Sequence, residues 1–104
     1  MNDAQLLQRF AEQNSEAAFR ALMERHLPLV FGTARRMTGD NAPAQDIAQT
    51  VFILLARKGN RLGPNTILSG WLHRTTRFVA ARALTAEWRR RRREQEAVTI
   101  ISFR

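Results

Sequence analysis

Cysteine is absent from this sequence of 104 residues, and histidine occurs only as His26 and His73. This excludes a disulfide framework and thiolate-bound zinc, and two histidines are too few for a histidine-rich metal site. Neither histidine has a carboxylate or nucleophile partner at a helix-compatible spacing, and no phosphate-binding loop or dinucleotide fingerprint occurs. We therefore expect no metal, no cofactor and no enzymatic activity.

Long hydrophobic runs are also missing. The longest apolar block runs only from Val51 to Ala56, far short of the ~18 residues that a membrane span needs. The N-terminus lacks the features of a secretory signal, so we expect a cytoplasmic location and no membrane contact. With 44% hydrophobic and 25% charged residues, a chain of this length can bury one core but not two.

Acidic residues are scarce in the second half of the chain. Residues 1–52 contain five arginines against six carboxylates, whereas residues 53–104 contain twelve basic residues against three carboxylates. The net charge of +8 therefore resides in the C-terminal half, which predicts that this half binds a polyanion. Sixteen of the seventeen basic residues are arginine, whose planar donors suit phosphates and bases. A solvated charged surface is the alternative interpretation.

The hydrophobic spacing is helical throughout and favours no strand. We predict an all-α fold, a small bundle of four helices that cover about residues 3–11, 15–37, 42–58 and 66–93. Pro28 should leave the second helix kinked or split, because proline lacks a backbone donor. The fourth is a long C-terminal helix. Residues 1–95 should form the domain, and residues 96–104 a linker or frayed C-terminal tail.

The third helix is predicted to have one packing face and one free face. At about 100° per residue, the packing face carries Ile47, Val51, Leu54 and Leu55. The free face carries Asp46, Gln49, Thr50, Ile53 and Arg57. A free face that mixes aliphatic and polar groups indicates a surface for a partner.

The fourth helix combines a buried stripe with an adjacent line of rings and guanidinium groups. The predicted stripe consists of Leu68, Leu72, Thr75, Val79, Ala83 and Ala86. The adjacent line consists of Trp71, Arg74, Phe78 and Arg82. Such a line is typical of single-strand binding, because rings stack on bases while cations follow the backbone. Alternatively, the two rings only border the core.

Five consecutive arginines, Arg89 to Arg93, allow three interpretations. They could form a phosphate clamp on duplex DNA, an RNA-binding tail or a solubilising helix end. Because adjacent like charges repel, we expect this block to be helical only with a polyanion bound, and otherwise frayed. Trp88 beside it either anchors the block on the core or grips nucleic acid. We place His26 at the core edge and His73 facing DNA or solvent.

The stretches SEAAFRALMERHLPLVFGTARRMTGDNAPAQDIAQTVFILLAR and GWLHRTTRFVAARALTAEWRRRRREQEA resemble region two of extracytoplasmic-function sigma factors of bacterial RNA polymerase. In that family a DxxQxxF motif docks on the clamp coiled coil of the polymerase beta-prime subunit. The resemblance implies polymerase contacts at Asp46, Gln49, Thr50, Phe52, Ile53 and Ala56. A glutamate often follows the glutamine in this family, and Thr50 in its place weakens the acidic part of docking.

The same resemblance implies that the loop and helix around WLHR open and read the minus-ten promoter element on the non-template strand. The resemblance implies pocket residues in the loop and contacts from the WLHR element: Asn60, Arg61, Leu62, Asn65, Thr66, Ser69, Trp71, His73 and Arg74. From charge and helical spacing we expect further DNA contacts at Arg77, Phe78, Arg82, Arg89 and Arg90. The loop differs from the shorter acidic form of better-known members, so the base that it reads is not implied. The length leaves no room for a region that reads the minus-thirty-five element, so we expect a separate or truncated domain.

The sequence thus predicts a transcription initiation domain with RNA polymerase core and promoter DNA as partners. An anti-sigma factor is a further partner to expect. One alternative is a helical protein-interaction module for a regulator, in which the arginines serve only solubility. The other is a small RNA-binding protein, which would prefer structured RNA.

Overall fold

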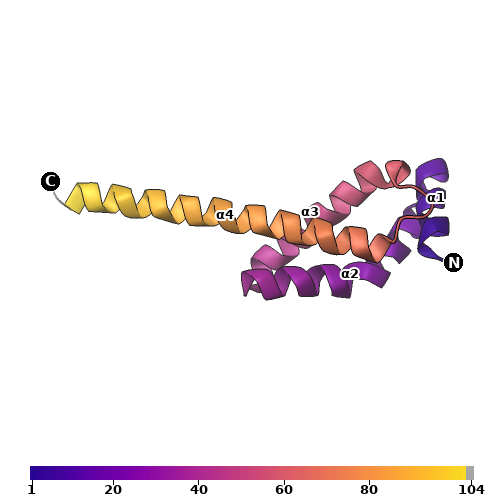
Figure 1. Ribbon diagram of the computed structural model, residues 1–104, viewed down its shortest axis with the longest axis horizontal. Coiled ribbons are helices and arrows are strands. Elements are labelled where there is room, and N and C mark those ends of the chain that lie inside the picture. Colours follow the sequence, from indigo (N-terminus) through magenta and orange to yellow (C-terminus); the bar gives the residue numbers. More distant parts are fainter. Residues whose placement is uncertain (103–104) are drawn as a thin grey trace.

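The computed structural model describes residues 1–102, and within them four α-helices and one short 3-10 turn are found. The elements are α1 (Asp3–Gln13), α2 (Glu16–Thr38), α3 (Asn41–Lys58), η1 (Gly59–Arg61) and α4 (Leu68–Ser102). α2 packs against α1, α3 and α4, and α3 also packs against α4 (Figure 1). The predicted all-α bundle with a long C-terminal helix is confirmed.

Side-chain caps fix the starts of the first two helices. At α1, Asn2 accepts the backbone N–H of Gln5 at 2.8 Å, and the Gln5 side chain accepts the N–H of Asn2 at 2.9 Å. At α2, Ser15 accepts the N–H of Ala18 at 3.1 Å. Gly39 ends α2 with a φ of 75°, in the left-handed region that favours glycine. The starts of α1 and α2 and the end of α2 therefore lie within one residue of the predicted bounds.

Pro28 lies inside α2 and does not split it, because one helix runs from Glu16 to Thr38. Proline cannot donate to the carbonyl four residues earlier, which belongs to Glu24. Both residues are exposed. Water can therefore replace the lost hydrogen bond, and the helix continues.

A single line of buried side chains anchors α4 in the bundle. Each follows the previous one by four residues: Leu68, Leu72, Thr76 and Ala80. They face a core whose largest fully buried members on the other helices are Leu22, Val30, Val51 and Leu55. Thr76 donates its hydroxyl to the carbonyl of Leu72 at 2.7 Å, so its burial costs little.

The predicted stripe of α4 is correct at Leu68 and Leu72 and requires correction further along. Thr75 and Val79 are half-buried, whereas Ala83 and Ala86 are exposed. These residues lie on the side of α4 that the helical wheel predicts to be buried. At Ala83 and Ala86, however, the other helices do not cover this side.

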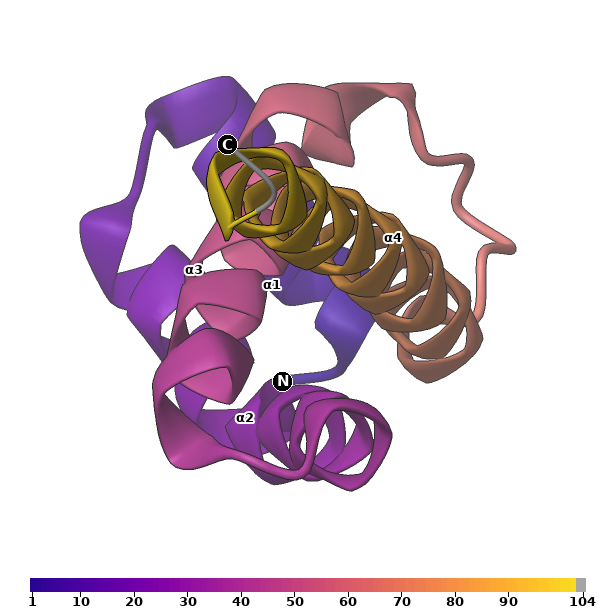
Figure 2. The ribbon, with the colours of Figure 1, turned by 90° about the vertical axis from the view of Figure 1, so that its left-hand side faces the viewer.

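α4 extends well beyond the bundle. The molecule measures 64 Å along its longest axis and 22 Å along the other two, and Figure 1 shows α4 projecting on one side. Viewed along the projection, the free end of α4 points toward the viewer and the other helices lie behind it (Figure 2). From Trp88 to Ser102 every residue is exposed. No helix of the described residues combines the length and apolarity that a bilayer span requires.

The structure corrects the expected helix end near Arg93 and the frayed tail from residue 96, because α4 continues to Ser102. Residues 103 and 104 lie outside the described residues. No glycine or proline follows Gly70, so the sequence contains no strong helix breaker in this segment.

A buried histidine ties α1 to α2. His26 is 7% exposed and its Nε2 lies 2.9 Å from Oδ2 of Asp3, while Arg25 donates to Oδ1 of Asp3 at 2.8 Å. Partial burial acts to raise the pKa of Asp3, but the hydrogen bonds from His26 and Arg25 outweigh it and lower the pKa. The predicted core-edge position of His26 is confirmed.

A substitution in the buried line of α4 (Leu68, Leu72, Thr76 and Ala80) should lower the free energy of unfolding far more than a substitution in the part of α4 that projects beyond the bundle. Leu72 is fully buried, so Leu72→Ala should lower the free energy of unfolding by about 2–5 kcal/mol through lost contacts and a cavity. Ile100→Ala removes an equally large side chain that is 60% exposed and should change it by less than ~0.5 kcal/mol. Urea denaturation followed by circular dichroism measures both, and equal losses would contradict the packing described.

Candidate nucleic-acid interface and docking face

Trp71, Arg74, Phe78 and Arg82 lie along one outward side of α4, and we call them the ring-arginine line. Phe78 is 61% exposed, and both arginines are exposed. Trp71 is half-buried and packs against the hydrophobic core. Trp71 thus borders the core, as the alternative interpretation of the two rings expects. Phe78 is open to solvent, so this interpretation does not describe it.

Both arginines of this line are positioned by their neighbours. The guanidinium of Arg82 lies over the Phe78 ring, 5.6 Å from its centroid, which is a cation–π distance. Arg74 folds back over Gly70, where an added Cβ would lie 3.4 Å from its Nη1. Arg74 therefore points toward the N-terminal end of α4, where the preceding loop joins the helix.

The loop before α4 has a fixed base and an exposed tip. At its base, η1 packs against α1, and a Cβ on Gly59 would lie 3.2 Å from Cδ2 of Leu7. Leu62 and Thr66 are half-buried, and Thr66 donates its N–H to the carbonyl of Gly63 at 3.0 Å. The other predicted loop contacts are exposed: Asn60, Arg61, Asn65 and Ser69. Their amide, hydroxyl and guanidinium groups are thus available to a ligand.

His73 and Arg77 do not belong to the ring-arginine line. At about 100° per residue, His73 lies roughly 160° around α4 from Trp71, and Arg77 roughly 120°. His73 is half-buried at the opposite edge of the buried line of α4, and Arg77 is exposed. The structure therefore separates these two predicted DNA contacts from Trp71 and Phe78.

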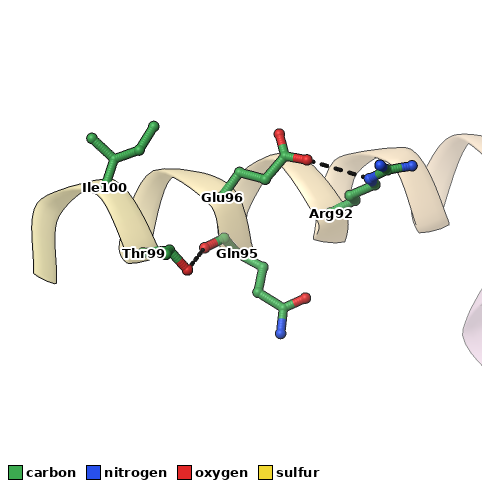
Figure 3. Close-up of a pocket in the computed structure, with 5 residues that line it drawn as sticks. All are labelled: Arg92, Gln95, Glu96, Thr99 and Ile100. Atoms are coloured by element: carbon green, nitrogen blue, oxygen red, sulfur yellow. Dashed lines mark hydrogen bonds and ion pairs between the residues drawn. The ribbon is translucent and has the colours of Figure 1, made fainter. Parts of the chain in front are cut away.

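The arginine block is helical and carries its own counter-charges. Ion pairs about one turn apart join Arg90 to Glu87 and Glu94, Arg91 to Glu87, and Arg92 to Glu96. Figure 3 shows the last of these pairs along the helix surface. The expectation that helix formation requires a bound polyanion is therefore corrected, because i,i+4 pairs of opposite charge support a helix.

Two arginines of the block differ from the rest. Arg89 and Arg93 have no carboxylate within 4.0 Å among residues 1–102. Arg92 additionally lies over the ring of Trp88, 5.3 Å from its centroid. Trp88 is 60% exposed, so it does not anchor the block on the core.

Glu87 is the carboxylate with two arginine partners. The hydrogen bond from Arg90 lowers the pKa of Glu87 to about 2, with a smaller contribution from Arg91. The same contact raises the pKa of Arg90 above its already high ordinary value. Glu87 and its partners therefore remain ionised at neutral pH.

The free face of α3 is exposed as predicted, at Asp46, Gln49, Thr50, Ile53 and Arg57. The first four of these residues form what we call the docking face, together with Ala56, which the family resemblance implies as a contact and which is also exposed. Ile53 is 52% exposed, which leaves an aliphatic side chain in solvent. The hydroxyl of Thr50 donates to the carbonyl of Asp46 at 3.0 Å. Phe52, predicted as a contact, is only 4% exposed and packs in the core. It supports the face from beneath and cannot itself reach a partner.

A hollow of about 520 Å³ lies where α4 passes the turn between α2 and α3. Its floor is apolar, and carboxylates stand at its edges. The lining residues are Thr38, Asp40, Pro43, Asp46, Ile47, Ala83, Leu84, Glu87 and Arg91. Within residues 1–102, no group of three potential metal-ligating side chains is clustered.

Residues 22–93 match the protein family described as Sigma-70 region 2. The chain belongs to this family. It is 35% identical over 66 residues to the RNA polymerase sigma factor CarQ of Myxococcus xanthus. This match covers 64% of the chain but only 37% of CarQ, so the chain spans well under half of that relative.

A solved structure supports the same assignment. The NMR structure of an engineered region 2 of sigmaE in complex with GTAAAA matches with a TM-score of 0.74 and 28% sequence identity, covering 86% of this chain and 93% of that chain. The resemblance to extracytoplasmic-function sigma factors is confirmed. The family consists of transcription factors and not of enzymes.

Two features of this sigma region 2 domain escaped prediction from the sequence. Asp3 and His26 are 23 residues apart, and no helical spacing relates them. The pairing of Glu87 with Arg90 and Arg91, in contrast, is visible as a spacing of three and four residues. The charge pattern around the block could therefore have revealed these pairs.

The ion pairs of Glu87 should be measurable directly. A side-chain carboxyl NMR titration should give Glu87 a pKa of about 2, below the ordinary glutamate value of 4.5, because both arginines favour the charged form. Arg90→Gln combined with Arg91→Gln removes these partners and should return the pKa to the ordinary range. An unchanged pKa in that variant would show that the pairs do not form in solution.

Proposed function

We propose that this sigma region 2 domain docks on the clamp coiled coil of the polymerase beta-prime subunit through α3. We further propose that the loop before α4 and the ring-arginine line bind the non-template strand of the opened minus-ten element. The observation that carries the proposal is a pair of exposed surfaces on different helices with different chemistry. Because the surfaces are separate, polymerase and DNA can bind at the same time.

On the DNA side, rings and amides have complementary tasks. Phe78 exposes most of its ring, and stacking on an unpaired base contributes about 1–3 kcal/mol. Asn60 and Asn65 are exposed in the loop, and an amide can both donate to and accept from the edge of a flipped base. The match to a region 2 bound to GTAAAA supports this assignment.

Removal of the Phe78 ring should weaken single-strand binding. Phe78→Ala should raise the Kd for a promoter-like single-stranded oligonucleotide by the equivalent of ~1–3 kcal/mol, because one stacking platform is lost. Fluorescence anisotropy of labelled DNA measures the Kd. Leu84→Ala is the control, because Leu84 is also an exposed apolar residue of α4, 41% exposed, but outside the ring-arginine line. Similar effects of both variants would reject the ring assignment, and tighter binding to structured RNA would favour an RNA-binding protein.

On the polymerase side, the docking face offers both hydrogen bonding and apolar area. Gln49 presents an amide and Ile53 an aliphatic side chain that is 52% exposed. Exposed aliphatic groups beside polar groups suit a helical partner such as a coiled coil. With Thr50 where relatives often have glutamate, this face depends more on Gln49 and Ile53 than on acidic charge.

Substitutions on the docking face should weaken polymerase capture and leave DNA binding intact. Gln49→Ala and Ile53→Ala should each weaken binding of a purified clamp coiled coil by about fivefold or more, as expected for central interface residues. A pull-down followed by titration measures this, with Gln8→Ala on α1 as the control. If capture is unaltered while helicity and DNA binding are normal, the docking assignment is wrong.

A further inference from the structure

The arginine block exposes less usable charge than its sequence suggests. Five arginines follow one another, but three of them already bind the carboxylates of Glu87, Glu94 or Glu96. Only Arg89 and Arg93 lack such a partner among the described residues. The number of free cations in the block is therefore two.

These two arginines continue the ring-arginine line. At about 100° per residue, Phe78, Arg82, Arg89 and Arg93 fall within an arc of roughly 60°. Phe78, Arg82 and Arg89 also border the same shallow surface hollow. Arg91 points to the opposite side of α4, where it lines the hollow near α2 and α3 together with Glu87.

We propose that Glu87, assisted by Glu94 and Glu96, is an internal anion that withholds Arg90, Arg91 and Arg92 from DNA phosphates and leaves Arg89 and Arg93 as the DNA-binding cations of the block. This inference rests on the proposed DNA binding. It removes Arg90 from the expected DNA contacts and adds Arg93. The carboxylates engage all three guanidinium nitrogens of Arg90 and the Nε of Arg91 and Arg92, and they neutralise the positive charge that would attract a phosphate.

Such an internal anion makes DNA binding more selective. Phosphate contacts strengthen binding to every sequence equally, whereas rings and loop amides respond to bases. Exposed ion pairs are individually weak, but Glu87 binds two arginines at once, at 2.6 Å and 2.9 Å. Glu87 is also half-buried at the point where α4 leaves the bundle, which restricts its side chain.

The decisive experiment measures how DNA affinity depends on salt. For single strands, log K falls with log salt at a slope of about −0.7 for each phosphate bound. Glu87→Gln frees Arg90 and Arg91 in part, so binding to a 20-nucleotide oligo(dT) should tighten and its slope should steepen by up to about 1.4. Glu24→Gln is the control, because it makes the same change in net charge at an exposed position of α2.

A reciprocal pair of variants tests which arginines bind. Arg89→Gln with Arg93→Gln should flatten the slope by about 1.4, since two phosphate contacts are lost. Arg90→Gln with Arg91→Gln removes the same charge from the same block and should flatten it by less than half as much. Circular dichroism of each variant shows whether α4 remains helical, and a variant that loses helicity is replaced by the corresponding alanine variant, which also removes the charge and favours a helix.

The outcomes separate this inference from the proposed function. If Glu87→Gln behaves like Glu24→Gln, or if both double variants flatten the slope equally, the internal anion is rejected while DNA binding stands. If the unaltered domain does not bind oligo(dT) or promoter-like strands, the proposed function fails. Retention on a heparin column, a polyanion that needs no base recognition, then still decides the role of Glu87: unchanged retention of Glu87→Gln relative to Glu24→Gln overturns it, and later elution supports it.

Discussion

The rotation of α4 about its own axis, set by the buried line from Leu68 to Ala80, determines every outward surface of this domain that involves α4. Four small or aliphatic groups at intervals of four residues pack against α2 and α3. This packing leaves the ring-arginine line facing away from the core. Because an α-helix is stiff, the same rotation fixes the direction of each arginine in the block. From Trp71 to Arg93 the helix rises about 33 Å at 1.5 Å per residue. A contact made inside the bundle therefore orients cations that touch no other helix.

Most of the fold could be predicted because its signals are local. Asn2, Ser15 and Gly39 mark helix ends through hydrogen bonds and backbone preferences that span only a few residues. Burial along α4 was harder to predict, because a helical wheel shows in which direction a side chain points but not how far the neighbouring helices extend. Ala83 and Ala86 lie on the predicted side and are nevertheless exposed. Beyond Glu87 helicity depends on side-chain pairs within α4. The helix therefore continues without a core to pack against, whereas we expected it to end there.

The candidate surfaces were predictable to the degree that they follow helix geometry. The docking face agrees with the wheel at Asp46, Gln49 and Ile53. Phe52 was predicted as a polymerase contact from a family motif, which does not show where its side chain points. Its side chain is part of the core. His73 was assigned to DNA through the WLHR motif and Arg77 through its charge, and both lie on other sides of α4 from the exposed ring of Phe78. A motif identifies which residues matter to a family, but packing decides whether each acts as a contact or as a support.

Net charge describes this domain poorly because charges within one helical turn compensate each other. The sum of +8 counts the paired and the free arginines alike, whereas a phosphate is attracted less strongly to a guanidinium whose charge a neighbouring carboxylate already neutralises. Rings and cations occur together along the part of α4 that is packed in the bundle, and the projecting part carries cations that are mostly paired. Electrostatic attraction falls off within about 10 Å at ordinary salt, so unpaired arginines act on the DNA that lies beside them. In the proposed function the domain distinguishes opened promoter strands from other DNA, and this arrangement then favours selectivity, since an unrestrained block of five arginines would bind every sequence alike.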